Sequence, residues 1–278
     1  HLAANANKEL KEISEKEIKI PVRDGARVCI LIYSPQDIKP DDSRHLVVLI
    51  YSGGFILRSA EIEMPTCVTA VREYGYVTVS LEHRLSPEVK FPVAYNDCWD
   101  TLILLHTSEF NTDPNRRLIF GGTSAGSYIS IPLAHKARDE GLKPPISGLF
   151  HSVPPALPPQ ALTNKYQPLY RSRELLKDGI TLISKSTAVY DIAVEPDFNS
   201  PLWSPLLWPT GHKDLPPMFF QICGADLLRD KVLIYERELR LENRVKTRTI
   251  YNYPTYSAST KFTEDSVAGL GWLLGKEA

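Results

Sequence analysis

The segment 122-GTSAG-126 has the residue types and spacing of a serine nucleophile on a sharp turn. It directly follows the apolar run 117-RLIF-120 and precedes a stretch with helical spacing. Between a strand and a helix, a Gly-x-Ser-x-Gly pattern exposes the serine, and its neighbours must be small because larger side chains would collide with the turn. Ser124 is therefore predicted to be a nucleophile, and the amide of Ala125 is predicted to face a developing oxyanion.

A second set of amide donors is expected from the glycine pair at the end of 45-HLVVLIYSGGF-55. Glycine lets backbone N–H groups approach an oxyanion without steric interference. Gly53 and Gly54 are the predicted donors of this oxyanion hole. A Gly-Gly pair on its own is equally compatible with a simple turn.

The acid that would accompany the serine is predicted at Asp226, in the turn after the apolar run 217-PMFFQIC-223. This position agrees with the chain order Ser, Asp/Glu, His that one class of serine enzymes uses. Asp226 is equally suited to cap the helix expected from residue 227 onwards. Asp230 is a second candidate, but it lies inside that helix and is expected to be a solvated charge.

The general base that a serine nucleophile needs is missing, because all seven histidines precede Asp226. Two of them, His83 and His151, follow apolar runs at what should be the active end of the sheet, and Tyr51 stands beside the predicted oxyanion loop. These three residues are the candidate replacement acids or bases, with a purely structural role as the alternative. The histidines are His1, His45, His83, His106, His135, His151 and His212.

Short apolar runs rich in Val, Ile, Tyr and Phe alternate with helix-length stretches along most of the chain. This alternation predicts an α/β fold with a mostly parallel sheet and helices on both faces. The first run has an alternating pattern and could be an antiparallel edge strand. The chain is expected to form one domain, 1–278. The predicted strands cover 27–34, 45–51, 74–81, 117–122, 146–152, 217–223 and 246–252.

Residues 153–216, called the insert below, interrupt this alternation with many prolines and aromatic side chains. A long segment without strand periodicity inside a compact domain is usually functional, so the insert is predicted to be a lid over the end of the sheet. A meandering connection is the alternative. The aromatic composition predicts an apolar or aromatic small-molecule partner, bound at the carboxyl ends of the strands.

Composition excludes several classes of function. A net charge of −1 without a basic run gives no indication of a nucleic-acid partner. The longest apolar run, 46–51, is far too short to span a membrane, and the polar N-terminus lacks a signal-peptide pattern, which predicts a cytoplasmic location. The scattered cysteines form no C-x-x-C pair, and no phosphate loop is present, so neither metal nor cofactor is predicted. The oligomeric state is not readable from these features.

The order and spacing of these motifs resemble the hormone-sensitive-lipase-like, or carboxylesterase-like, branch of the α/β-hydrolase family, with fungal members closest. The likeness runs from about Ile18 to Leu274. It implies an α/β-hydrolase fold with about eight strands, a lid built from 1–16 and 153–216, and acyl-group chemistry. The motifs that carry it are 84-RLSPEVKFPVAYND-97, 121-GGTSAG-126, 204-SPLLWPTGHKDLPP-217 and 223-CGADLLRD-230.

The sequence departs from this family at the site itself. Where the family's oxyanion loop begins His-Gly-Gly-Gly, this chain has Tyr-Ser-Gly-Gly at 51–54, and Ser127 stands where the family has glycine. The family's Y-P-G-x-P-H-G-F block has no counterpart. It is either deleted between Tyr251 and Tyr253 or aligned so that Ala258 occupies the histidine position.

The sequence supports three interpretations of function. The favoured one is a biosynthetic enzyme that acts on a carbonyl- or ester-bearing apolar small molecule and is repurposed for cyclisation, elimination or isomerisation. Altered residues at both the base and the oxyanion loop motivate it. The second is a serine carboxylesterase whose histidine segment is missing from the present sequence. The third is a catalytically silent receptor, since plant hormone receptors of this family also lost the histidine.

Overall fold

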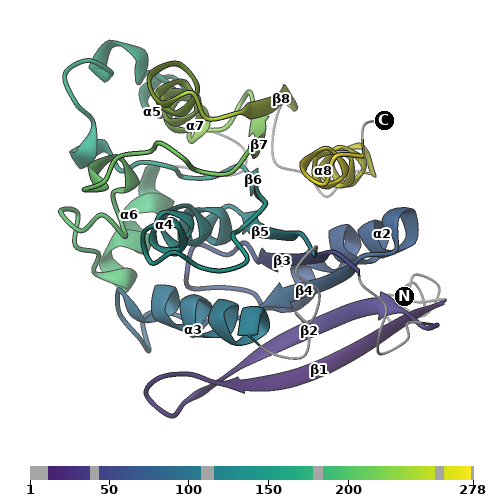
Figure 1. The fold of residues 1–278 in the computed structure, drawn as a ribbon. Coiled ribbons are helices and arrows are strands. Elements are labelled where there is room, and N and C mark those ends of the chain that lie inside the picture. The colour runs from purple at the N-terminus through teal and green to yellow at the C-terminus, as the bar shows by residue number, and fades with distance from the viewer. Residues whose placement is uncertain (1–11, 38–43, 108–115, 178–183, 254–259, 277–278) are drawn as a thin grey trace.

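A computed structural model describes residues 12–37, 44–107, 116–177, 184–253 and 260–276 (Figure 1). Within these ranges, eight strands form one sheet in the order β1-β2-β4-β3-β5-β6-β7-β8. Pairing is antiparallel from β1 to β2 and from β2 to β4, and parallel across the rest of the sheet. The strands are β1 (Ile13–Pro21), β2 (Arg27–Pro35), β3 (Leu46–Ile50), β4 (Val77–Leu81), β5 (Leu118–Thr123), β6 (Gly148–Ser152), β7 (Met218–Cys223) and β8 (Thr247–Tyr253).

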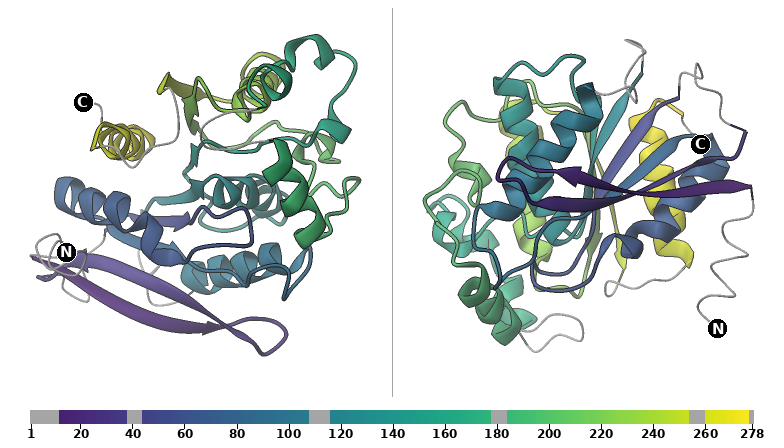
Figure 2. Two further views of the ribbon diagram at one scale, coloured as in Figure 1. Left: turned by 180° about the vertical axis from the view of Figure 1, so that it is seen from behind. Right: turned by 90° about the horizontal axis from the view of Figure 1, so that it is seen from below.

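Helices cover both faces of the sheet (Figures 1 and 2). α3, α4 and α7 lie on one face, and α2 and α8 lie side by side on the other. The α-helices are α2 (Met64–Tyr74), α3 (Val93–Thr107), α4 (Ala125–Asp139), α5 (Ser172–Leu175), α6 (Ser184–Val194), α7 (Arg229–Arg237) and α8 (Thr260–Leu273). Shorter helical turns are η1 (Ala60–Glu63), η3 (Pro159–Ala161), η4 (Gln167–Leu169), η5 (Pro205–Leu207) and η6 (Glu238–Glu242).

Strand β3 shows why such a sequence folds into a covered sheet. All five of its side chains are buried, and successive side chains of a strand point to opposite faces. Leu46, Val48 and Ile50 pack into one apolar cluster, whereas Val47 and Leu49 pack into the cluster on the other face. A continuous apolar run is what a strand buried on both sides requires. The predicted α/β architecture is therefore confirmed.

The seven predicted strands coincide with β2 to β8, but β1 was not predicted. Most side chains of β1 are exposed, so its sequence, ISEKEIKIP, contains no apolar run. It pairs with β2 along its whole length, from Ile13 opposite Pro35 to Pro21 opposite Arg27. The run expected at an antiparallel edge is β2, which is antiparallel but lies one strand inside the edge.

The predicted lid needs one correction. Residues 13–16 belong to the edge strand β1, where backbone hydrogen bonds to β2 hold them, and residues 1–11 of the predicted lid lie outside the described residues. In the described part of the insert, short helices and turns occur and no strand does. Figure 1 shows the insert at the carboxyl ends of the parallel strands, beside α4.

Candidate active site

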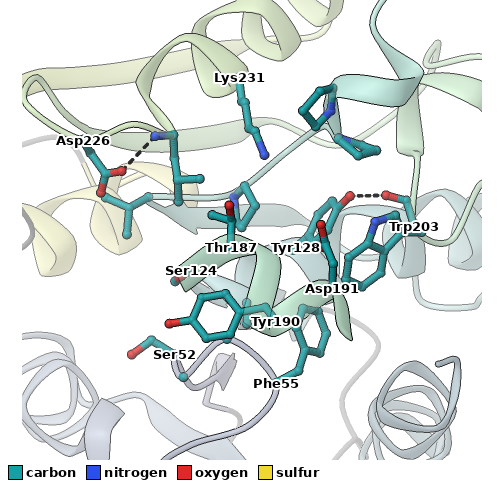
Figure 3. A pocket seen from close by; sticks show the side chains of 18 of the residues that line it. Ser52, Phe55, Ser124, Tyr128, Thr187, Tyr190, Asp191, Trp203, Asp226 and Lys231 are labelled. Atoms are coloured by element: carbon teal, nitrogen blue, oxygen red, sulfur yellow. Dashed lines mark hydrogen bonds between the residues drawn. The ribbon is translucent and has the colours of Figure 1, made fainter. Parts of the chain in front are cut away.

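The carboxyl ends of three parallel strands bring the predicted site residues together. Gly53 and Gly54 follow β3, Ser124 follows β5, and Asp226 follows β7. All of them line one pocket with a volume of about 230 Å³, which the insert completes (Figure 3). Residues far apart in the sequence thus meet where parallel strands end, which is the usual position of ligand sites in such sheets.

The backbone at Ser124 is held in an uncommon conformation. Its φ is 52° and its ψ is −114°, a combination that costs energy for a residue with a side chain. Ser124 N donates to Ser152 O at 2.8 Å, and Tyr128 N donates to Ser124 O at 3.0 Å. A Cβ atom at Gly126 would lie 2.0 Å from the carbonyl oxygen of Ile50. The turn therefore requires a small residue here, because α4 begins directly against β3.

Ser127 reinforces the turn at the position where the resemblance leads one to expect glycine. Its hydroxyl donates to the carbonyl of Gly122 and accepts a hydrogen bond from Ser152 N at 3.1 Å. The side chain is completely buried. The departure from the family pattern thus links the ends of β5 and β6 beneath the candidate nucleophile.

The glycine loop after β3 leaves two amides available. In the described part of the chain, no residue accepts a hydrogen bond from the N–H of Gly53 or Gly54. A Cβ atom at Gly53 would lie 1.9 Å from the carbonyl oxygen of Leu57, and Gly54 has a φ of +61° and lies under the ring of Tyr190. The geometry requires glycine at both positions. Free amides beside a serine are what an oxyanion hole consists of.

Asp226 is buried at the edge of the pocket. Its Oδ1 accepts a hydrogen bond from Leu228 N at 2.8 Å, so the carboxylate also holds the turn that leads into α7. Burial raises the pKa of Asp226, while this hydrogen bond and the charge of Lys231 oppose the increase. The alternatives of site acid and helix-capping residue are thus both compatible with its position.

Asp230 differs from expectation, because it is a buried anchor rather than a solvated charge. Its carboxylate accepts hydrogen bonds from the amides of Arg171, at 2.8 Å, and of Ser172. Arg229 donates to the same carboxylate at 2.8 Å. Asp230 therefore fastens α5 of the insert to α7, and its role in this structure is to position the insert.

Two of the candidate replacement bases lie behind the glycine loop. The rings of Tyr51 and His83 are stacked with centroids 4.9 Å apart. The Nδ1 of His83 is 2.9 Å from the carbonyl oxygen of Arg84, and the Tyr51 hydroxyl donates to the His83 carbonyl at 3.4 Å. Burial lowers the pKa of His83. Both residues line a different hollow, beside Glu82, and neither belongs to the described lining of the Ser124 pocket.

His151 lies in the sheet interior and not at the pocket. It is completely buried, its ring packs on Phe220 with centroids 5.3 Å apart, and its Nδ1 is 3.4 Å from the Ser130 hydroxyl. Burial lowers the pKa of His151 to about 3. This environment favours a neutral, structural imidazole. Ala258, the alternative match to the family histidine, lies outside the described residues.

Several pocket residues were not singled out from the sequence. Aromatic side chains of the core and the insert form one wall, and the Tyr128 hydroxyl donates to the carbonyl of Trp203 (Figure 3). Lys231 was missed because it reads as a solvated charge on an amphipathic helix. A signal existed, since Lys231 lies three and four residues before Ile234 and Tyr235, on the buried face of α7. The remaining lining includes Arg58, Gln160, Arg173, Thr187 and Asp191, together with Tyr190 and Phe198, two of the insert aromatics on which the predicted lid was based.

Among the described residues, no cluster of three or more His, Cys, Asp or Glu side chains is arranged to hold a metal ion. The helices of that same part of the chain include none long and apolar enough to cross a membrane.

The sheet is eight-stranded and mostly parallel, and it carries a serine on a strained strand-to-helix turn beside free amides of a glycine loop. These features define an α/β-hydrolase type of site. The chain belongs to the alpha/beta hydrolase fold family, whose profile matches residues 47–255. The resemblance to carboxylesterase-like members with fungal relatives is confirmed, and the protein is an enzyme of this family.

Two curated fungal relatives illustrate the relationship. An AB hydrolase superfamily protein of Schizosaccharomyces pombe is 35% identical over 274 residues, which cover 95% of this chain and 80% of the relative. A versiconal hemiacetal acetate esterase of Dothistroma septosporum is 28% identical over 239 residues, which cover 81% of this chain and 72% of the relative.

Two solved structures are similar over nearly the whole chain. The crystal structure of a vibralactone cyclase has a TM-score of 0.87 and 29% identity, and the match covers 98% of this chain and 85% of that one. A bacterial heroin esterase has a TM-score of 0.81 and 25% identity, and the match covers 98% of this chain and 89% of that one. The related proteins thus include both esterases and a cyclase.

Proposed function

We propose that the protein activates a carbonyl or ester group of an apolar small molecule for non-hydrolytic chemistry, with intramolecular cyclisation as the leading case. Ser124 and the amides of Gly53, Gly54 and Ala125 would contact the reacting carbonyl. The observation that carries the proposal is a strained serine turn and free amides in a pocket whose described lining contains no histidine.

The missing imidazole determines which reactions remain accessible. Without it, Ser124 is an ordinary alcohol, and an oxyanion hole with substrate binding retains only roughly 10³–10⁴-fold acceleration over water. A reaction within one bound molecule needs less acceleration from catalytic groups, because an aromatic pocket that holds a reactive conformer already brings the two reacting groups together. The similarity to a vibralactone cyclase supports this class of reaction.

In such a cyclisation, a hydroxyl of the substrate attacks the polarised carbonyl and forms a new C–O bond. The bond from the carbonyl carbon to the leaving oxygen breaks, and the hydroxyl proton passes to that oxygen. The reaction consumes no water, because every atom of the substrate is found in the lactone or in the released alcohol. The pocket contribution is to polarise the carbonyl and to keep water from the acyl group.

A serine carboxylesterase is the second candidate. Relatives named as esterases favour it, among them the versiconal hemiacetal acetate esterase and the heroin esterase. It requires a histidine after Asp226, which the sequence does not contain. The intact mass of the natural protein distinguishes the two candidates, because a mass above 31.3 kDa that maps near Tyr251 would restore the triad.

The decisive activity experiment uses hydroxy esters with an aromatic chain in water enriched in ¹⁸O. We expect a lactone without ¹⁸O as the product, and we expect Ser124→Ala to reduce its formation by roughly 10²-fold or more. Ser127→Ala is the comparison variant, because it removes a hydroxyl behind the turn and leaves the Ser124 hydroxyl in place. Efficient Ser124-dependent release of ¹⁸O-labelled acid would contradict the proposal and establish the esterase.

A further inference from the structure

Lys231 presents a charged group to the pocket, and the described part of the chain offers it no hydrogen-bond or ion-pair partner. Its side chain is only 8% exposed, and it belongs to the same pocket lining as Ser124. Figure 3 shows its amine pointing from α7 into the pocket. No residue in the described ranges forms a hydrogen bond or an ion pair with Lys231 Nζ. An unpaired ammonium in such a place is unfavourable, because water no longer solvates it fully.

Charged groups from three elements face Lys231. They are Arg173 on α5, Asp191 on α6 and Asp226 in the turn before α7. Burial, followed by the charge of Arg173, lowers the pKa of Lys231 to about 8, and the two carboxylates oppose this shift. Lys231 is therefore still largely protonated near neutral pH.

The two carboxylates do not neutralise the pocket. Asp226 already accepts the hydrogen bond of Leu228 N, and burial raises the pKa of both Asp191 and Asp226. The lining that the structure describes also contains the cations of Arg58 and Arg173, so in it three cationic side chains face two carboxylates. An anionic ligand group is compatible with this balance, whereas a cationic one adds to the excess charge.

We propose that Lys231 binds an anionic oxygen of the substrate, so that the substrates are apolar or aromatic molecules that carry a carboxylate as well as the reacting carbonyl. A carboxylate would accept charge-assisted hydrogen bonds from the ammonium, and such bonds are about twice as strong as neutral ones. The apolar body would lie against the aromatic wall around Tyr128 and Trp203. This substrate class rests on the proposed function only in taking the Ser124 pocket as the substrate site.

Binding of 4-phenylbutanoate and of its neutral isostere 4-phenylbutanamide tests the inference by calorimetry. Near pH 7 we expect the carboxylate to bind roughly ten-fold more tightly than the amide. Because binding raises the pKa of Lys231, titrations near pH 8 in buffers of different ionisation enthalpy should show uptake of about half a proton.

Variants at Lys231 separate the charge from the fold. Lys231→Gln should abolish the preference for the carboxylate while the amide still binds, which also shows that this variant is folded. Lys231→Arg should keep part of the preference. Lys16→Gln, at an exposed lysine of the edge strand β1, is the matched control and should bind like the wild type.

Three outcomes would overturn the inference. They are equal binding of the two ligands, no binding of either ligand at millimolar concentration, and an unchanged preference for the carboxylate in Lys231→Gln. A preference that strengthens as the pH rises above about 8 would also overturn it, since the neutral amine would then be the active form. Ser124→Ala should retain carboxylate binding. Loss of turnover therefore tests the proposed function, and loss of carboxylate binding tests this substrate class.

Discussion

At the scale of single residues, the charge of Lys231 should reduce the stability of the folded protein. The pKa of this lysine falls from 10.5 to about 8 on folding, so the unfolded chain binds more protons between these values. The penalty is complete below about pH 8 and is relieved as the pH rises toward 10.5. Its size is about 3 kcal/mol, from about 1.4 kcal/mol for each pH unit.

Lys231→Met should therefore be more stable than the wild type near pH 7, by about 3 kcal/mol, and this advantage should shrink as the pH approaches 10.5. Urea denaturation of both proteins across this pH range measures the difference, in which the titration of other groups cancels. Two stability curves that stay parallel would show that the lysine is solvated in the folded state.

Part of the predicted site set lines one pocket, namely the residues whose local chemistry restricts the choice of residue type, and their roles stay predictions. The three candidate replacement bases lie elsewhere. A strained turn such as that of Ser124 tolerates few neighbours, and the glycine loop with Gly53 and Gly54 has no room for side chains. For Lys231 the sequence offered only the weaker signal of its spacing from Ile234 and Tyr235, because a lysine on an amphipathic helix is common on protein surfaces. Only the packing of the insert over α7 makes its charge unusual.

At the scale of elements, the close approach of α4 to β3 should make Gly126 intolerant of substitution. Gly126→Ala places a methyl group 2.0 Å from the Ile50 carbonyl, so the helix must shift, at a cost of about 3 kcal/mol or more. Gly141→Ala is the matched control. Gly141 has a φ of +67° but open space around it, so only the backbone conformation is penalised, by about 1–2 kcal/mol.

Urea midpoints of the two variants measure the contrast. A Gly126→Ala protein that is no less stable than Gly141→Ala would show that α4 moves away from β3 easily.

Strands β2 to β8 were predictable because burial leaves apolar runs in their sequences. The edge strand β1 was not, because one partner strand and solvent surround it and its exposed positions are free to be polar. The insert was recognised because its sequence lacks the strand periodicity found along most of the chain. Its internal arrangement follows from tertiary contacts such as those of Asp230, which no local pattern specifies.

At the scale of the whole molecule, the cysteines report on how the sheet and its helices unfold. Cys67, Cys98 and Cys223 are buried, Cys29 is half-buried, and all four are free thiols. Burial raises the pKa of every one of them, to about 11 for Cys29 and about 12 for Cys223. Low thiolate content and low access should make the native protein slow to react with thiol reagents.

We expect Cys29 to be alkylated first, and the three buried thiols to react together only when the whole sheet unfolds. Mass spectrometry of alkylated peptides across a urea gradient measures this order. Alkylation of Cys98 on α3 well below the unfolding midpoint would instead reveal an independently opening region.

The pocket has two structural origins, the ends of the sheet and the insert. The serine turn and the glycine loop belong to the sheet, whereas Tyr190 and Asp191 belong to α6 of the insert. Mutations in the insert can therefore alter ligand preference while the serine turn and the glycine loop stay intact. A lineage that keeps this sheet can acquire new substrates by varying one segment of the chain.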